Sequence, residues 1–379
     1  MRCAVIALIV GVMAGAMATA GRAGEAGGIP DHEIERIVLG QIDAYLPADM
    51  PGGVAVAVRE GGRTLFVNRG FAARHLDEPV TADSLFNLGS LGKVFISALL
   101  AKAHRDGVLN LDDPVAKHVT ELQAGSDMRR VTLRQLASYT SGFVLPQDLP
   151  PWPERFFTLP QFIATLNDWE ADAQHEPGQQ MIYSHAGYML LHLALERRFG
   201  MPIGQLVEQQ ISQPLGLSST VLPFASRKAH PRGKLPSALA RRAVQGYSPD
   251  GERIGKRGGL QGFYLWLGTG QMYSSPRDMA VFPATALGER PDQPALQAAI
   301  RLAQQSVLLS DGEYFQALAW EIRKGEQTIV DKYGGLNNAT AYIGMIHNRR
   351  LGVVILANRG RLGLDSMGRD LLLDLARAR

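Results

Sequence analysis

The chain has 379 residues, of which 46% are hydrophobic and 20% are charged. This composition is typical of a globular protein with one large domain or two interleaved domains. The 39 basic and 36 acidic residues give a net charge of only +3. Because a nucleic-acid-binding surface needs a strong basic excess, we expect no nucleic-acid partner.

The first 20 residues resemble a secretory signal peptide. Arg2 gives a basic start, the run 4–17 is apolar, and Ala18-Thr19-Ala20 supplies small residues for cleavage. The run is shorter than a membrane-spanning helix requires, so we expect no stable membrane anchor after cleavage. Cys3 is the single cysteine, and its removal with this segment would leave a cysteine-free mature chain. These features favour a bacterial periplasm.

One helix and one hairpin are predicted at the start of the mature chain. Residues 31–46 carry apolar side chains at helical spacing, which predicts an amphipathic helix. The β-rich runs 53–59 and 64–68 surround a glycine turn and predict a β-hairpin.

The stretch around Ser90 combines a reactive side chain with a predicted helix. Ser90 and Lys93 stand directly before the apolar run 94–103, and Gly107 ends it, so we expect a buried helix that starts near Ser90. Residues three apart share one helix face, which brings the Ser90 hydroxyl within reach of the Lys93 amine. The unpaired N–H groups of a first helical turn can stabilise an oxyanion.

The middle of the chain, residues 115–222, carries helical signals separated by proline-rich loops. Residues 132–135 have capping-box spacing and predict a short helix. The run 186–199 closes at Gly200, and 203–211 predicts a further short helix. We therefore expect 115–222 to form an all-helical domain.

A stretch rich in basic residues follows this helical part. It contains Arg227, Lys228, Arg232, Lys234, Arg241, Arg242, Arg253, Lys256 and Arg257, opposed only by Asp250 and Glu252. A solvated loop explains this cluster, and a positive rim that attracts carboxylate-bearing substrates is the alternative.

Short strands return in the last third of the chain. The β-type runs are 315–322, 328–333, 340–347 and 351–357, and residues 365–378 predict a C-terminal helix. The fold class is therefore α+β, with a mixed, mainly antiparallel sheet flanked by helices in 21–114 and 223–379, plus the all-helical lobe. Active sites commonly lie between two such parts.

Three short motifs stand in a fixed order along the chain. They are Ser90-Leu91-Gly92-Lys93, Tyr183-Ser184-His185 and Lys332-Tyr333-Gly334. They resemble the active-site motifs of the serine β-lactamase and penicillin-binding-protein superfamily, with class C β-lactamases and their esterase relatives the most similar. Segments 136–142, 214–217, 274–279 and 351–358 also follow the family's order, so the resemblance spans nearly the whole mature chain. It implies a β-lactamase/transpeptidase-like fold.

The resemblance implies a role for each motif residue. Ser90 is the expected nucleophile, and it needs a neighbouring base because serine is a poor nucleophile near neutral pH. Lys93 is the expected base, and Tyr183 resembles the family's tyrosine that moves protons. Lys332 would add positive charge beside the pocket. Singly, these residues have simpler explanations as a helix cap, core packing or an edge charge; their joint order favours the catalytic role.

Two glycines after Lys332 fit the same interpretation. Gly334 and Gly335 have no Cβ, so the strand backbone can approach a bound acyl group. By resemblance, the N–H of Gly335 and that of Ser90 form the oxyanion hole.

Three positions are predicted to bind substrate, and two of them depart from the family pattern. His185 stands in place of an asparagine, and because an imidazole titrates at about pH 6 to 7, we expect activity to vary with pH there. Tyr333 stands in place of a threonine and should narrow the pocket, which predicts poor turnover of penicillins and cephalosporins. Gln147 matches a family glutamine that contacts the substrate amide.

We expect neither a cofactor nor a metal ion. The nine histidines form neither His-x-His nor His-Glu-x-x-His, since His175-Glu176 continues into Pro177. The leading function is a monomeric periplasmic hydrolase that opens β-lactam rings through a Ser90 acyl-enzyme. One alternative is an esterase, or a D-amino-acid peptidase or amidase, of the same fold. Another is a non-catalytic penicillin- or peptidoglycan-binding protein.

Overall fold

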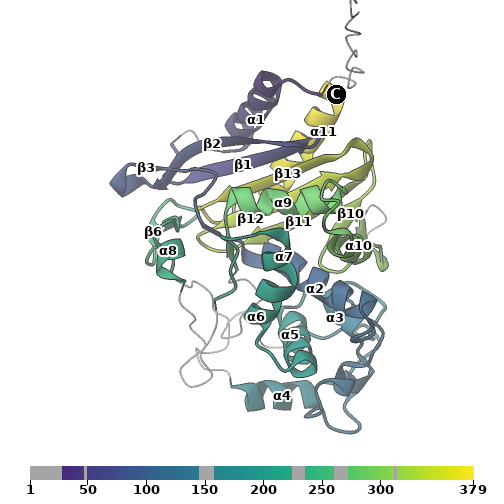
Figure 1. Cartoon of the computed structure of the whole chain (residues 1–379). Helices are drawn as coiled ribbons and strands as arrows, with labels where there is room; N and C mark the ends of the chain where they lie inside the picture. The colour runs from purple at the N-terminus through teal and green to yellow at the C-terminus, as the bar shows by residue number, and fades with distance from the viewer. Residues whose placement is uncertain (1–27, 47–48, 145–157, 224–234, 260–271, 311–313) are drawn as a thin grey trace, which may run out of the picture.

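The computed structural model describes residues 28–46, 49–144, 158–223, 235–259, 272–310 and 314–379 (Figure 1). The predicted signal peptide at 1–20 and the predicted substrate residue Gln147 lie outside the described residues. None of the helices within the described ranges is long and apolar enough to cross a lipid bilayer.

A nine-stranded sheet forms the centre of the molecule, and neighbouring strands pair antiparallel throughout. Strands from the two ends of the chain meet in its middle, where β1 pairs with β13. In spatial order the strands are β3 (Glu78–Pro79), β2 (Arg63–Ala73), β1 (Gly53–Glu60), β13 (Leu351–Ala357), β12 (Thr340–Ile346), β11 (Ile329–Gly335), β10 (Glu321–Arg323), β9 (Tyr314–Gln316) and β8 (Leu308–Ser310). The predicted sheet flanked by helices is confirmed.

Helices cover both faces of the sheet (Figure 1). α1 (Asp31–Tyr45) and α11 (Leu364–Ala378) pack on one face. α2 (Lys93–Arg105) and α9 (Pro276–Ala286) lie on the other face, with α10 (Pro294–Ala303) beside α2. Successive strand residues point to opposite faces of the sheet. In β12, Tyr342 therefore packs in the core beneath α1 and α11, and Ile343 packs in the core beneath α2 and α9. Alternation along each strand therefore supplies both cores.

Residues near the two ends of the described chain meet at a buried carboxylate. Glu60, at the end of β1, lies 3.4 Å from Arg63 and 3.6 Å from Arg379. Arg63 also donates to the carbonyl of Ile29 and pairs with Asp31. One cluster of charged side chains therefore joins the start of α1, the β1–β2 turn and the end of α11.

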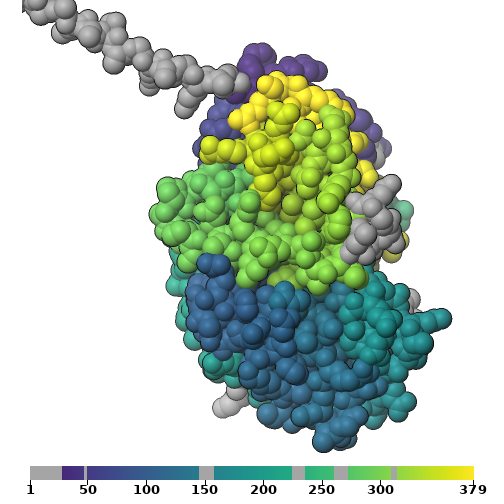
Figure 2. Space-filling model, turned by 90° about the vertical axis from the view of Figure 1, so that its right-hand side faces the viewer, coloured from purple at the N-terminus to yellow at the C-terminus, as the bar shows by residue number. Residues whose placement is uncertain are grey.

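The remaining α-helices gather at one end, below the sheet in Figure 1 and in the blue and teal part of Figure 2. They are α3 (Leu133–Ala137), α4 (Leu159–Asn167), α5 (His185–Phe199), α6 (Ile203–Val207) and α7 (Gln213–Leu215). The predicted capping box is present, since Thr132 and Gln135 satisfy each other's backbone N–H groups. One continuous hydrophobic cluster joins these helices to the sheet, so the boundaries at 114 and 222 stay a prediction.

Short elements connect these layers. The pairs β4 (Phe86–Asn87) with β7 (Tyr273–Ser274) and β5 (Gly246–Tyr247) with β6 (Arg253–Ile254) are antiparallel. The others are α8 (Ser237–Ala240), the 3₁₀ turns η1 (Arg74–Leu76), η2 (Gly89–Gly92), η3 (Val115–Lys117), η4 (Asp127–Arg130) and η7 (His347–Arg349), and the π turn η6 (Glu208–Ser212).

Several element boundaries differ from the sequence predictions. The helix predicted to start near Ser90 begins as the 3₁₀ turn η2, and α2 starts at Lys93; such turns are frequent at helix N-termini. The strand predicted at 315–322 is two strands, β9 and β10, because the chain turns at Ala319 with φ of 67°. The helix α9 was not predicted, since Pro283 lies inside it, whereas Pro276 stands at its first turn, where proline is tolerated.

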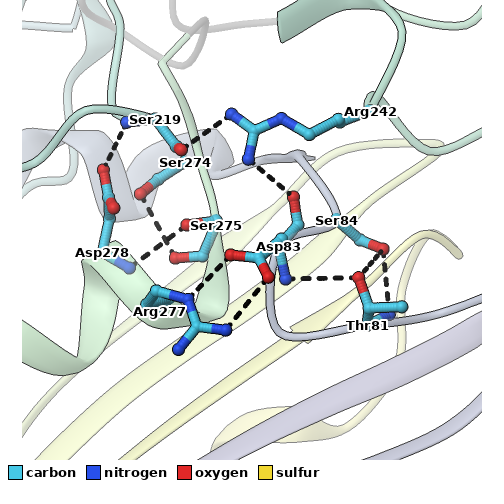
Figure 3. Close-up of polar contacts among 9 residues, drawn as sticks. All are labelled: Thr81, Asp83, Ser84, Ser219, Arg242, Ser274, Ser275, Arg277 and Asp278. Atoms are coloured by element: carbon cyan, nitrogen blue, oxygen red, sulfur yellow. Dashed lines mark hydrogen bonds and ion pairs between the residues drawn. The ribbon is translucent and has the colours of Figure 1, made fainter.

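The segment that leads to Ser90 is held by the polar network in Figure 3. Arg277 of α9 binds the Asp83 carboxylate at 2.7 and 3.0 Å, and Arg242 binds the Asp83 carbonyl at 3.3 Å. Arg242 also binds Ser219 at 2.8 Å, and the backbone N–H of Ser219 donates to Asp278 at 2.7 Å. The network ties the approach to Ser90 to α9 and to the connection from the helical part.

Part of the basic stretch therefore serves the fold. Besides Arg242, Arg257 donates to the carbonyl of Ala243 at 2.8 Å and pairs with Glu78 at 2.6 Å. These two arginines bind internal acceptors rather than a substrate. A positive rim formed by the other basic residues stays a prediction.

Candidate active site

Ser90 and Lys93 lie at the junction of η2 and α2. The Lys93 ammonium is fully buried and donates to the Ser90 Oγ at 3.1 Å. Gly89 turns the chain ahead of Ser90 with φ of 52°, a conformation that favours glycine. The predicted approach of the amine to the hydroxyl is confirmed, although a 3₁₀ turn and not the first α-helical turn carries Ser90.

Tyr183 approaches Ser90 from the helical part. Its hydroxyl donates to the Ser90 Oγ at 2.7 Å, and its side chain is 37% exposed, so the phenol borders both the serine and solvent. The next residue, Ser184, caps α5 by accepting the Gly187 N–H at 2.9 Å. The cap fixes where α5 starts and therefore the position of the Tyr183 backbone directly before it.

Lys332 reaches the same place from β11. It is buried, and its Nζ lies 5.4 Å from the centroid of the Tyr183 ring. Burial lowers the pKa of Lys332, while the acidic groups of Glu321 and Asp331 oppose this shift. The Lys93 Nζ also lies 5.4 Å from the Tyr183 centroid, so two lysine side chains surround one phenol.

β11 packs directly on η2 through its glycines. A Cβ on Gly334 would lie 2.5 Å from the Leu91 nitrogen and closer still to the Leu88 oxygen, so only glycine fits there. A Cβ on Gly89 would lie 3.2 Å from the Gly335 nitrogen, which places the Gly335 N–H beside the turn that carries Ser90. Two backbone N–H groups aimed at one point can stabilise a developing oxyanion.

His185 begins α5 with its ring edge toward Tyr183, at a centroid distance of 5.1 Å. Burial lowers the pKa of His185 to about 2, and the positive charges of Lys93 and Lys332 act in the same direction. A lowered pKa favours the neutral imidazole near pH 7. It argues against the prediction that His185 titration makes activity depend on pH near neutrality, because that prediction assumed an ordinary exposed histidine.

Tyr333 does not enter the pocket. Its ring packs in the core beneath α11, and its hydroxyl lies 3.5 Å from the Leu362 carbonyl. Strand alternation explains this, since Tyr333 pairs with Tyr342 on the α11 face whereas Lys332 pairs with Ile343 on the opposite face. The prediction that its phenol narrows the pocket is wrong.

A buried acidic residue lies behind Lys332. Asp331 accepts from Arg369 at 2.6 Å and from the Tyr342 hydroxyl at 3.2 Å. Burial raises the pKa of Asp331 to about 6, although the charge of Arg369 opposes the shift. Arg369 also lies 3.6 Å from Glu321, so this arginine gathers the acidic groups nearest to Lys332.

Sequence reasoning assigned no role to Tyr139, which the structure places against Tyr183 and Lys332. Its ring is buried and lies 4.7 Å from that of Tyr183. The Lys332 Nζ is 5.0 Å from its centroid. The signal available in the sequence was a tyrosine at the turn between a capped short helix and Gly142.

This arrangement suits acyl transfer. One hydroxyl has an amine and a phenol within hydrogen-bonding distance, and a backbone N–H pair stands beside it. Of the predicted site residues, the structure brings together Ser90, Lys93, Tyr183, His185, Lys332, Gly334 and Gly335. Within the described ranges, His, Cys, Asp and Glu side chains nowhere gather in threes that could hold a metal ion.

Comparison with known proteins gives a consistent match. The Beta-lactamase family model matches residues 42–377. A β-lactamase of Yersinia enterocolitica is 29% identical over 363 residues, covering 86% of this chain and 87% of that protein. A β-lactamase of Escherichia coli K12 is 26% identical over 361 residues, covering 86% and 89%.

Solved structures share the fold over nearly their whole length. A class C β-lactamase from Rhodobacter sphaeroides matches with a TM-score of 0.76 at 26% identity, covering 90% of this chain and 99% of that chain. A β-lactamase/D-alanine carboxypeptidase from Pseudomonas syringae matches in fold, with a TM-score of 0.76 at 22% identity, covering 91% and 98%.

Proposed function

The chain belongs to the Beta-lactamase family, and from this premise we propose that it is a periplasmic serine hydrolase that opens β-lactam rings through a Ser90 acyl-enzyme. The single observation that carries the proposal is the convergence on the Ser90 Oγ of the Lys93 amine at 3.1 Å and the Tyr183 hydroxyl at 2.7 Å. A serine held by two proton-transfer groups has the arrangement that nucleophilic catalysis requires.

Acylation moves one proton and exchanges one bond. The Ser90 oxygen bonds to the lactam carbonyl carbon as its proton passes to Lys93 or Tyr183, whichever is then deprotonated. The positive charges of the two lysines beside the Tyr183 ring stabilise its phenolate, so Tyr183 can be the deprotonated group that takes this proton. The carbonyl oxygen becomes negative beside the N–H groups of Ser90 and Gly335. The ring C–N bond then breaks, and the leaving nitrogen takes a proton from Tyr183.

Deacylation reverses these roles with water as the nucleophile. Tyr183 borders solvent, so a water molecule can reach it after the ring has opened. The Tyr183 phenolate, left after the leaving nitrogen was protonated, accepts a proton from water as the water oxygen adds to the acyl carbon. The bond from the acyl carbon to the Ser90 oxygen then breaks, and Ser90 takes its proton back from Tyr183, directly or through Lys93. Neutral His185 can hydrogen-bond the side-chain amide of a substrate without adding charge.

Intact-mass measurement tests the proposal. The protein is mixed with a penicillin, a chromogenic cephalosporin and p-nitrophenyl acetate, and a transient acyl adduct is expected with turnover of the lactams. A folded Ser90→Ala variant should form no adduct. Lactam hydrolysis by Ser90→Ala at the parent rate would overturn the mechanism. A long-lived adduct without turnover would favour a penicillin-binding protein. The absence of an adduct with every probe would favour a non-catalytic binding protein.

A D-amino-acid peptidase or esterase is the second candidate, favoured by the likeness in fold to the β-lactamase/D-alanine carboxypeptidase from Pseudomonas syringae. The same Ser90 acyl-enzyme serves both reactions, because only the leaving group differs. Comparing kcat/KM for the lactams, p-nitrophenyl acetate and a D-alanyl-D-alanine peptide separates the two functions. Export to the periplasm is tested by N-terminal sequencing of the mature protein, with cleavage after Ala20 expected.

A further inference from the structure

Tyr139 holds a backbone conformation that a tyrosine rarely adopts. It follows α3 with φ of 58°, in the left-handed region, and its side chain is only 1% exposed. A bulky residue in this region carries strain, and such strain persists only where the surrounding structure imposes it. The contacts of Tyr139 with its neighbours therefore indicate why this conformation is maintained.

The backbone of Tyr139 anchors the segment that carries Tyr183. Its carbonyl accepts the N–H of Ile182 at 2.7 Å, and the carbonyl of Thr140 accepts the N–H of Gly178 at 2.7 Å. The residue directly before Tyr183 is thus bonded to Tyr139. A change at Tyr139 can shift the phenol that contacts Ser90.

The ring of Tyr139 contacts both Tyr183 and Lys332. Its centroid lies 4.7 Å from that of Tyr183, with 31° between the ring planes. The Lys332 Nζ is 5.0 Å from the Tyr139 centroid and 5.4 Å from that of Tyr183, so the ammonium lies against two aromatic rings. Aromatic faces attract cations, which favours a fixed position for this buried ammonium.

We propose that Tyr139 is a positioning residue that holds the Tyr183 phenol and the Lys332 ammonium in place beside Ser90. The inference rests on the proposed function and deepens it. The backbone carbonyl of Tyr139 sets the position of the Tyr183 segment, and its ring packs against both the Tyr183 ring and the Lys332 ammonium. Its side chain acts through these two groups and forms no bond with the substrate.

Three replacements test the ring. Tyr139→Phe keeps the ring and should retain kcat/KM for a chromogenic cephalosporin within about threefold. Tyr139→Leu removes it and should lower kcat by about 10- to 100-fold with little change in KM, because misplaced proton-transfer groups slow the chemical step. Phenylalanine fluorinated on the ring keeps the volume but weakens the attraction for a cation. It should move the basic limb of the pH profile down by about half a unit, since the Lys332 ammonium is less stabilised.

Phe143→Leu is the matched control. Phe143 is a buried aromatic residue of the same segment that packs on Trp169, at a centroid distance of 5.9 Å. Its truncation should lower the unfolding temperature without changing the pH profile. The proposal is overturned if Tyr139→Leu has the same kcat and pH profile as Phe143→Leu and the fluorinated variant has the same pH profile as Tyr139→Phe. Tyr139 would then only fill the core. Should Tyr139→Leu not fold, the fluorinated variant alone decides.

Failure of this inference is distinguishable from failure of the proposed function. If the parent protein forms no Ser90 adduct with the cephalosporin, the proposed function fails and the positioning role fails with it. If the parent forms the adduct and the Tyr139 variants acylate at the parent rate with an unshifted profile, only the role of Tyr139 is refuted.

Discussion

The two faces of strand β11 serve different purposes within three consecutive residues. Lys332 lies against the Tyr183 ring, whereas Asp331 and Tyr333 lie on the opposite face against α11. The pocket face places charge beside Tyr183, and the α11 face holds that strand in position through Arg369 and Tyr342. A motif along one strand therefore combines a face toward Ser90, for which we propose a catalytic role, with a supporting face.

The largest contrast between the faces is expected for Lys332→Met and Tyr333→Phe. Loss of the buried ammonium should lower kcat/KM for a β-lactam by about 100- to 1,000-fold, the scale of one preorganised electrostatic contact. Tyr333→Phe removes only a hydroxyl directed at Leu362 and should stay within about twofold. Steady-state kinetics measure both changes. Equal losses would mean that the two faces are not functionally distinct.

The adjacent glycines give a second contrast. Gly334→Ala places a Cβ 2.5 Å from the Leu91 nitrogen, so β11 must move away from η2, and kcat/KM should fall by about 100-fold. Gly335→Ala meets only the end of the Tyr333 ring at 2.8 Å, a side chain that can rotate away. We expect the kcat/KM of Gly335→Ala to remain within about tenfold of the parent value. A reversed order of the two losses in lactam hydrolysis would contradict the assignment of faces.

Asp331→Asn probes the supporting face through stability. The pKa of Asp331 is raised from 3.8 to about 6, so the folded state holds this proton more tightly than the unfolded state. The associated stability is complete below about pH 4 and is lost as pH rises through 6, on the order of 3 kcal/mol. Relative to Asp331→Asn, the parent should therefore lose unfolding free energy between pH 3.8 and about 6 in urea titrations, with little further change at higher pH. Asp365→Asn, at the exposed partner of Arg369, is the control, and a constant difference between parent and Asp331→Asn would contradict the shift.

His185→Asn is expected to have the smallest effect. The pKa of His185 is lowered from 6.5 to about 2, so the folded protein resists a proton that the unfolded chain takes up. Stability from this group is present above pH 6.5 and is lost as pH falls, by about 1 kcal/mol at pH 5.5. The variant should lose less unfolding free energy on acidification. Its kcat/KM profile from about pH 5.5 to 8 should keep the parent shape, and a limb removed by the substitution would show that His185 titrates in the free enzyme.

The order of the three motifs predicted the family and the fold. The match to residues 42–377 confirms the family, and the likeness to the solved class C β-lactamase from Rhodobacter sphaeroides confirms the fold. The spacing was enough to predict the contact between Lys93 and Ser90, because residues three positions apart lie side by side on a helical turn. What spacing could not predict was the environment of each side chain. Tyr333 lies on the α11 face because of strand alternation, and burial beside lysines from α2 and β11 lowers the pKa of His185. Tyr139 was missed because its ring meets its partners only in the folded chain.

The carboxylate of Glu60 has a practical consequence for engineering. Because it lies beside both Arg63 and Arg379, and Arg63 also binds the carbonyl of Ile29, the first and last segments that the structure describes lie together at one corner of the α1–α11 layer. That layer is on the side of the sheet away from Ser90. A short peptide bridge between residues 28 and 379, with new ends opened in the loop between α9 and α10, should yield a circular permutant whose reactive serine is undisturbed.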